Sequence, residues 1–158
     1  MISMTTSVVI TPEQLLDHWQ GHRRVTRRLI SLFPEKELFE YSIGGMRTFA
    51  QLATELLRMA TPIALGVATG TWSDWKVEPK TKDEILQLWD EATGELDKAF
   101  KRIPPHRFQE VDTAFGQWKG TGIWMILYAI DNEVHHRGQG YVYLRSLGVE
   151  PPPFYDRS

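Results

Sequence analysis

Polar side chains are concentrated near the end of this chain, in a nine-residue segment that is otherwise surrounded by apolar residues. Residues 131–139 read DNEVHHRGQ, with apolar runs at 123–130 and 141–144. A helix with such flanks should be largely buried, and a buried polar group without a partner costs roughly 2–7 kcal/mol. These side chains must therefore be paired, hydrated or bound to a ligand. Asn132 and His136 are four residues apart, so they share one helix face and can bind a single metal ion.

A third candidate ligand, Glu55, lies far away in the sequence. It occupies an apolar helical stripe between Leu52 and Met59, where a carboxylate is costly unless it is paired or coordinates an ion. Two interpretations stay open at this point. Glu55 and His136 are metal ligands, or they form a buried ion pair.

Two further histidines, His18 and His22, are also four residues apart. Such a pair on one helix face can chelate zinc or nickel. Any amphipathic helix with two histidines has a fair chance of this spacing, so we expect hydrogen bonding in the core or at an interface instead.

Arg137 and Gln139 offer a different chemistry, because they can bind an anionic substrate or cross a subunit interface. Gly138 and Gly140 interrupt the same helical segment. Each glycine weakens a helix by about 1 kcal/mol relative to alanine. That cost indicates the close approach of another helix or of a ligand.

Four helical segments are expected to position these residues. Three begin with a threonine followed three residues later by glutamine or glutamate, the signature of a capping box. These threonines are Thr11, Thr48 and Thr81, and a fourth helix is expected to begin near Thr121. The apolar periodicity predicts helices over about 11–33, 48–66, 81–103 and 121–147. Pro62 is expected to kink or split the second helix near Thr61.

The connections at 70–80 and 104–120 are rich in aromatic residues and are expected to fold over the helices. Strand-like alternation appears nowhere at length. The pattern predicts an all-α four-helix bundle with ordered, aromatic-rich connections. We assign residues 1–10 to an N-terminal tail, 11–150 to the bundle and 151–158 to a C-terminal tail.

Bulk composition narrows the function classes. A chain of 158 residues fits one domain, and its net charge of −2 gives no support for a nucleic-acid partner. The absence of cysteine excludes a cysteine nucleophile, so thiol chemistry would need an external thiol. No stretch approaches the roughly 18 apolar residues of a membrane span, and the first ten residues do not resemble a signal peptide. We expect a cytoplasmic protein without a membrane or nucleic-acid partner.

Three strings together resemble the DinB-like (DinB/YfiT) superfamily. They are HHRGQ at 135–139, YLRSLGVEPP at 143–152 and GMRTFAQL at 45–52. The resemblance covers the chain from about Thr11 and implies a four-helix bundle that is commonly a homodimer. It also implies a divalent metal held by three histidines, one on the second helix and two on the last.

Carried over to this sequence, those ligand positions are Glu55, Asn132 and His136, of which only His136 is a histidine. Glutamate is a competent ligand for zinc, nickel or manganese, whereas a neutral amide is a poor ligand for the softer metals. We expect a metal at Glu55 and His136, with Asn132 or water completing the coordination shell.

The resemblance implies two classes of function. Some relatives look like thiol-dependent transferases or isomerases, in which the metal acts as a Lewis acid on a low-molecular-weight thiol. Such an enzyme would bind a small-molecule substrate in a cavity with Trp19 or His22 at its wall, and Glu133 or His135 would serve as general base. Other relatives are products of genes induced by DNA damage or stress. The alternative is thus a catalytically silent dimeric scaffold with a degenerate metal site.

Overall fold

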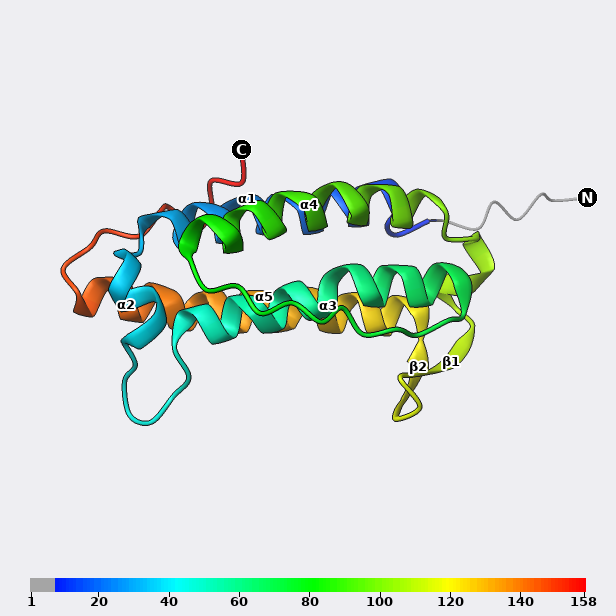
Figure 1. Ribbon diagram of the computed structural model, residues 1–158. Helices are drawn as coiled ribbons and strands as arrows, with labels where there is room; N and C mark the ends of the chain where they lie inside the picture. The colour runs from blue at the N-terminus through cyan, green and yellow to red at the C-terminus, as the bar shows by residue number, and fades with distance from the viewer. Residues whose placement is uncertain (1–7) are drawn as a thin grey trace, which may run out of the picture.

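Four long helices dominate the computed structural model, which describes residues 8–158. They are α1 (Pro12–Leu32), α3 (Phe49–Thr69), α4 (Lys82–Lys101) and α5 (Gly122–Ser146). Both α1 and α3 pack against α4 and α5, so the four helices form a bundle (Figure 1). The predicted four-helix bundle is therefore confirmed. Residues 1–7, most of the predicted N-terminal tail, lie outside the described residues.

Threonine caps begin the long helices as the sequence predicts. Thr11 and Thr48 each form a complete capping box with the glutamine three residues later. Thr81 forms only half of one. Its hydroxyl accepts from the Glu84 amide at 3.1 Å, but the Glu84 carboxylate accepts from the amide of Lys80 at 2.6 Å instead. The carboxylate thus accepts from the amide one residue before the N-cap, rather than from the N-cap amide itself, and still satisfies a free amide at the helix start.

Smaller elements were not predicted from the sequence. They comprise a short helix α2 (Glu35–Glu40), a 3₁₀ turn η1 (Pro105–Phe108) and an antiparallel hairpin of β1 (Val111–Ala114) and β2 (Trp118–Thr121). Strands of four residues are too short to show a clear period of two. Of the two outcomes expected at Pro62, a kink or a split, the split is wrong, because α3 runs through this residue as one helix; the kink stays a prediction.

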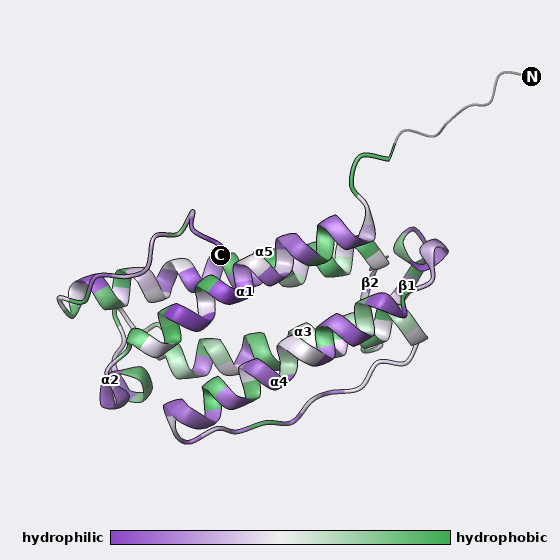
Figure 2. Ribbon diagram, turned by 90° about the horizontal axis from the view of Figure 1, so that it is seen from above, coloured by the Kyte–Doolittle hydropathy of each residue, from purple (hydrophilic) through white to green (hydrophobic). Residues whose placement is uncertain are grey.

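The aromatic connections do fold over the bundle. Trp72 and Phe115 pack against the core that α1, α3, α4 and α5 share, and Phe108 is buried in it. Trp75 packs against a second group of buried side chains at the other end of the bundle. Hydrophobic and hydrophilic residues alternate along the helices (Figure 2), and most of the fully buried side chains are apolar.

The C-terminal residues fold back onto α1. Arg24 donates to the carbonyl oxygen of Arg157 at 2.7 Å, and Arg28 donates to that of Asp156. Pro151 and Pro152 are buried. Within residues 8–158, no helix is both long and apolar enough to cross a membrane.

Candidate functional site

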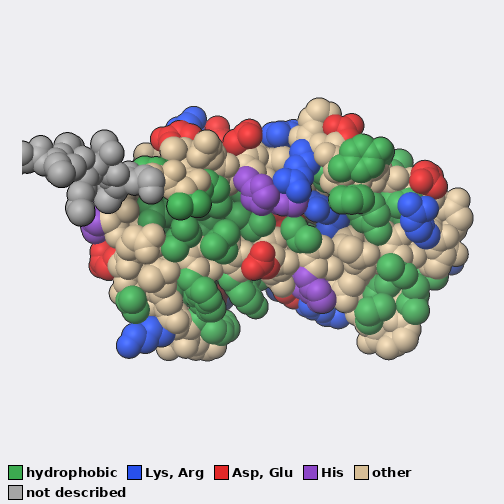
Figure 3. All heavy atoms as spheres, turned by 180° about the vertical axis from the view of Figure 1, so that it is seen from behind, with side chains coloured by type: hydrophobic (Ala, Val, Ile, Leu, Met, Phe, Trp, Pro, Cys, Tyr) green, Lys and Arg blue, Asp and Glu red, His purple; other side chains and the backbone are tan. Residues whose placement is uncertain are grey.

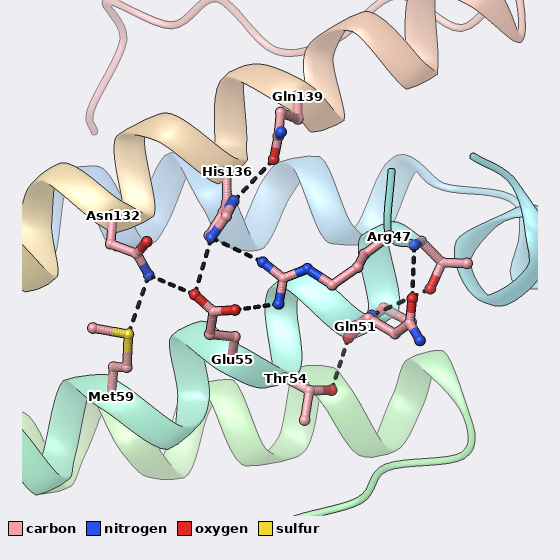
Figure 4. Close-up of polar contacts among 10 residues, drawn as sticks. Arg47, Gln51, Thr54, Glu55, Met59, Asn132, His136 and Gln139 are labelled. Atoms are coloured by element: carbon pink, nitrogen blue, oxygen red, sulfur yellow. Dashed lines mark hydrogen bonds and ion pairs between the residues drawn. The ribbon is translucent and has the colours of Figure 1, made fainter. Parts of the chain in front are cut away.

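Glu55 on α3 meets Asn132 and His136 on α5 at a single point (Figure 4). The Glu55 Oε1 atom accepts from Asn132 Nδ2 at 3.2 Å and lies 3.0 Å from His136 Nε2. The four-residue spacing on α5 places both side chains on the face that packs against α3. All three predicted ligand positions are thus brought together.

Arg47 joins this cluster, and sequence reasoning did not single it out. It precedes the cap of α3, donates to Glu55 Oε2 through Nη1, and brings Nη2 to 3.5 Å from His136 Nε2. The carboxylate therefore has a donor on each oxygen. A signal was present in the sequence, because a carboxylate on an apolar stripe needs a cation and Arg47 lies eight residues away.

The electrostatics of Glu55 follow from these contacts. Burial alone would raise the pKa of Glu55, but hydrogen bonds from Arg47, Asn132 and His136 outweigh burial, and its pKa is lowered. Glu55 is therefore the ionised acceptor of the cluster. About a third of its side chain is exposed, so one edge of the carboxylate remains open to solvent.

His136 is held from both sides. Its Nδ1 atom lies 2.9 Å from Gln139 Oε1, and its Nε2 atom faces Glu55. Both ring nitrogens thus lie within hydrogen-bond distance of an oxygen. The side chain is only 8% exposed, so the other members of the cluster are easier for a ligand to reach.

These side chains do not fit the divalent ion that the family resemblance implies. Zinc sites in proteins use at least three protein ligands, and only Glu55 and His136 are competent here. Asn132 offers a weak amide, and the Arg47 guanidinium already pairs with the carboxylate. Among residues 8–158, no group of three or more His, Cys, Asp or Glu side chains is arranged to hold an ion. The predicted metal at Glu55, Asn132 and His136 stays a prediction.

A cleft of about 730 Å³ begins at Glu55 and runs toward the hairpin. Its walls are aromatic: Trp72, Phe115, Trp118, Trp124 and Tyr128. Arg58 lies beside Glu55 at the polar end and is fixed by two hydrogen bonds to the carbonyl oxygen of Val77, at 2.7 and 3.1 Å. Most ligand sites combine such apolar walls with a few polar groups.

Phe115 is placed in the cleft by an unusual turn. Its φ is +52°, followed by +70° at Gly116, and the Gln117 amide donates to Ala114 O at 3.0 Å. A positive φ at a bulky residue is strained, and such strain is concentrated at functional sites. The ring lies edge-on to Trp72 and Trp118, with centroids 5.5 and 6.2 Å apart. The hairpin thus closes the aromatic end of the cleft.

The two predicted general bases are not brought to the cleft. Glu133 faces α1, where it accepts from Thr26 Oγ1 at 2.6 Å and Trp19 Nε1 at 3.3 Å. Burial raises the pKa of Glu133, although the Arg23 guanidinium and the Thr26 hydrogen bond oppose the rise. His135 is exposed on the outer face of α5. Catalytic roles for Glu133 and His135 stay predictions.

Each histidine of the His18–His22 pair lies within hydrogen-bond distance of an arginine. The rings lie edge-on with centroids 4.7 Å apart. Arg137 Nη2 is 3.0 Å from His22 Nδ1, and Arg157 Nη1 is 3.3 Å from His18 Nδ1. Burial, followed by the charge of Arg137, lowers the pKa of His22 to about 4. Neither His22 nor Trp19, both expected at the cavity wall, lines the cleft.

Two relatives are similar in sequence to this chain over most of its length. YjoA of Bacillus subtilis, an uncharacterized protein, is 26% identical over 150 residues, which is 91% of this chain and 96% of that protein. YrdA, an uncharacterized protein of the same organism, is 24% identical and covers 90% of this chain and 89% of its own length.

Solved structures share the fold. The DinB-like protein YjoA of B. subtilis superposes with a TM-score of 0.76 at 19% identity, over 92% of this chain and 99% of that one. A mycothiol-dependent maleylpyruvate isomerase gives 0.63 at 16% identity, over 87% of this chain and 68% of that one. The model of the DinB family matches residues 3–158. The chain therefore belongs to the DinB family, as the strings at 45–52 and 135–152 indicated.

Proposed function

We propose that this protein binds a small organic molecule in the aromatic cleft and transfers it to a low-molecular-weight thiol. The observation that carries the proposal is the cleft of about 730 Å³, with aromatic walls and with Glu55 and Arg58 at one end. Aromatic faces stack on a planar apolar body, while the charged end fixes its orientation. The substrate class is an electrophile with an aromatic or unsaturated body.

The external thiol is supported by two observations. The chain contains no cysteine, so the sulfur nucleophile would come from a cosubstrate. A protein of the same fold is a mycothiol-dependent isomerase. Arg58 lines the polar end of the cleft, and a neighbouring arginine favours the reactive thiolate over the thiol.

The predicted metal-dependent form of this reaction would use zinc, nickel or manganese at Glu55, Asn132 and His136. Because those side chains do not fit such an ion, the proposal contains no step through a metal. Here the chain's own residues bind and orient the reactants: the aromatic walls hold the electrophile, and Arg58 attracts the thiolate.

A model reaction tests the proposal. An aryl chloride activated by nitro groups is mixed with cysteine, glutathione or mycothiol. The thiolate sulfur bonds to the ring carbon, chloride leaves, and the thiol proton passes to solvent. We expect Trp118→Ala to lower kcat/KM by up to about tenfold, the value of one lost stacking contact. Tyr155→Ala is the matched control, because Tyr155 is more exposed and lies outside the cleft.

The outcomes separate the parts of the proposal. If the electrophile quenches tryptophan fluorescence but no thiol is transferred, the proposed binding stands and the proposed transferase activity is wrong. Neither quenching nor transfer with any of the three thiols would overturn the proposal.

A silent scaffold of the stress or DNA-damage response is the second candidate. One observation favours it: Glu55 Oε1 already lies within hydrogen-bond distance of His136 Nε2, at 3.0 Å. On this reading Glu55→Gln costs stability, about 1 kcal/mol for a partly exposed ionic hydrogen bond, and no thiol is ever transferred.

A further inference from the structure

We propose that Arg47 is the resident cation of this site: its guanidinium occupies the place of a divalent ion, supplies a single positive charge there, and excludes the ion. The side chain contacts both competent donors at once, Glu55 Oε2 through Nη1 and, at 3.5 Å through Nη2, His136 Nε2. The planar fork of an arginine suits this arrangement, because it presents two donors at a fixed spacing.

The donor atoms that an ion would need are already used. Glu55 Oε1 accepts a hydrogen bond from Asn132 Nδ2 and faces His136 Nε2, while Oε2 accepts a hydrogen bond from Arg47. An ion entering here would have to break these contacts and remain beside a fixed positive charge. Repulsion between the ion and the Arg47 guanidinium, which contact the same carboxylate, opposes ion binding strongly in a partly buried site.

The backbone holds Arg47 in position from two helices. The next residue, Thr48, caps α3 through its box with Gln51. From α5, the buried Tyr143 donates its hydroxyl to the carbonyl oxygen of Arg47 at 2.8 Å. Half of the Arg47 side chain is exposed, so the ion pair with Glu55, rather than burial, fixes the guanidinium. Removing this one side chain should therefore open the site without unfolding the bundle.

The experiment compares the wild type with N132H, R47Q and R47Q/N132H. N132H supplies a third competent ligand while keeping Arg47, so it is the matched control for the double variant. Each protein is loaded with zinc, nickel or manganese and desalted. Its retained metal is measured by mass spectrometry, and its melting temperature is measured with and without each ion.

We expect the wild type and N132H to retain essentially no ion and to melt at an unchanged temperature. The double variant should retain about one ion per chain, the capacity of a three-ligand site. At a hundredfold excess over Kd its melting temperature should rise by at least about 5 °C. R47Q alone should show a smaller rise, because Asn132 remains a weak ligand.

Three results would overturn the proposal. They are near-stoichiometric metal in the wild type, N132H binding as tightly as the double variant, and a folded double variant that gains no metal. Circular dichroism establishes folding. If the double variant does not fold, R47Q at millimolar zinc decides the question by the same rise in melting temperature. No cleft ligand enters these measurements, so they stand apart from the thiol-transfer assay.

Discussion

The ionisable side chains between α1 and α5 respond to burial in opposite ways. Burial raises the pKa of Glu133 and lowers that of His22 to about 4, because in each case it disfavours the charged form. His22 accepts a hydrogen bond from Arg137 through Nδ1, which requires that nitrogen to be unprotonated. At neutral pH the His22 ring is therefore neutral.

His22 should make the stability of the protein depend on pH. Its folded pKa, about 4, lies below the ordinary value of 6.5, so its contribution is complete above pH 6.5 and is lost as the pH falls toward 4. We expect the wild type to lose up to about 3 kcal/mol relative to His22→Gln over this window. Urea unfolding at several pH values measures the difference, with His18→Gln as control. Parallel stability curves for the wild type and His22→Gln would contradict the prediction.

Residue chemistry could be predicted from the sequence where spacing decides which side chains meet. The positions of Asn132 and His136 follow from helical periodicity, and Glu55 from the cost of a carboxylate on an apolar face. The partner of Glu55 was missed although Arg47 lies only eight residues away, because Arg47 reaches the carboxylate from the connection before α3, outside the helical periodicity. Nor could the sequence show that Glu133 faces α1, since α5 is polar on more than one side in this segment.

At the scale of elements, Gly140 shows why α5 contains glycine despite the cost. A Cβ atom at this position would lie 2.5 Å from Phe49 and 2.7 Å from Leu29. The predicted close approach at this glycine is therefore confirmed, with α1 and α3 as the neighbours. At Gly138 a Cβ would meet nothing within 4 Å.

Alanine substitution separates helix propensity from packing. Gly140→Ala should destabilise the protein by up to about 2 kcal/mol, because overpacking a core costs about 1–3 kcal/mol and alanine returns roughly 1 kcal/mol of helix propensity. Gly94→Ala is the matched control, since Gly94 lies within α4 and has open space around it. It should stabilise by up to about 1 kcal/mol. Guanidinium unfolding measures both, and equal effects at the two positions would refute the packing argument.

Elements were predictable where local signals are strong. Thr11, Thr48, Thr81 and Thr121 cap the four long helices as expected. The hairpin at 111–121 was missed because tertiary contacts stabilise it: Phe115 packs on the bundle through Trp72, and the Gly122 amide donates to Glu110 O. Such contacts produce no hydrophobic periodicity in the eleven residues of the hairpin, so the sequence pattern does not indicate them.

At the scale of the molecule, the outer face of α5 carries exposed apolar side chains that the single chain does not cover. They are Leu127, Val134 and Val142. The view of the molecule from behind shows hydrophobic side chains gathered in separate groups on this side (Figure 3). Apolar patches of this kind mark interaction surfaces, and the homodimer expected from the sequence stays a prediction that this surface can test.

The sequence of α5 favours an antiparallel pairing of two copies about Gly138. Val134 and Val142 are each four residues from Gly138, and Asp131 and Arg145 are each seven. A twofold axis at Gly138 would place Val134 opposite Val142 of the second copy, and Asp131 opposite its Arg145. A glycine at the crossing point lets the helices approach closely. The ion pair that Arg145 forms with Glu150 at 3.4 Å is exposed and weak enough to exchange.

Charge reversal tests this pairing more sharply than the loss of an apolar contact. Asp131→Arg should place like charges opposite each other at two symmetric points and weaken the dimer by about tenfold or more. Arg145→Asp should do the same, whereas the double reversal should restore the wild-type dissociation constant. Sedimentation equilibrium measures all four proteins, and Val111→Asp, on the exposed hairpin, is the control. Unchanged dissociation in both single variants would exclude this geometry. A double variant no tighter than either single would show that the two charges do not meet.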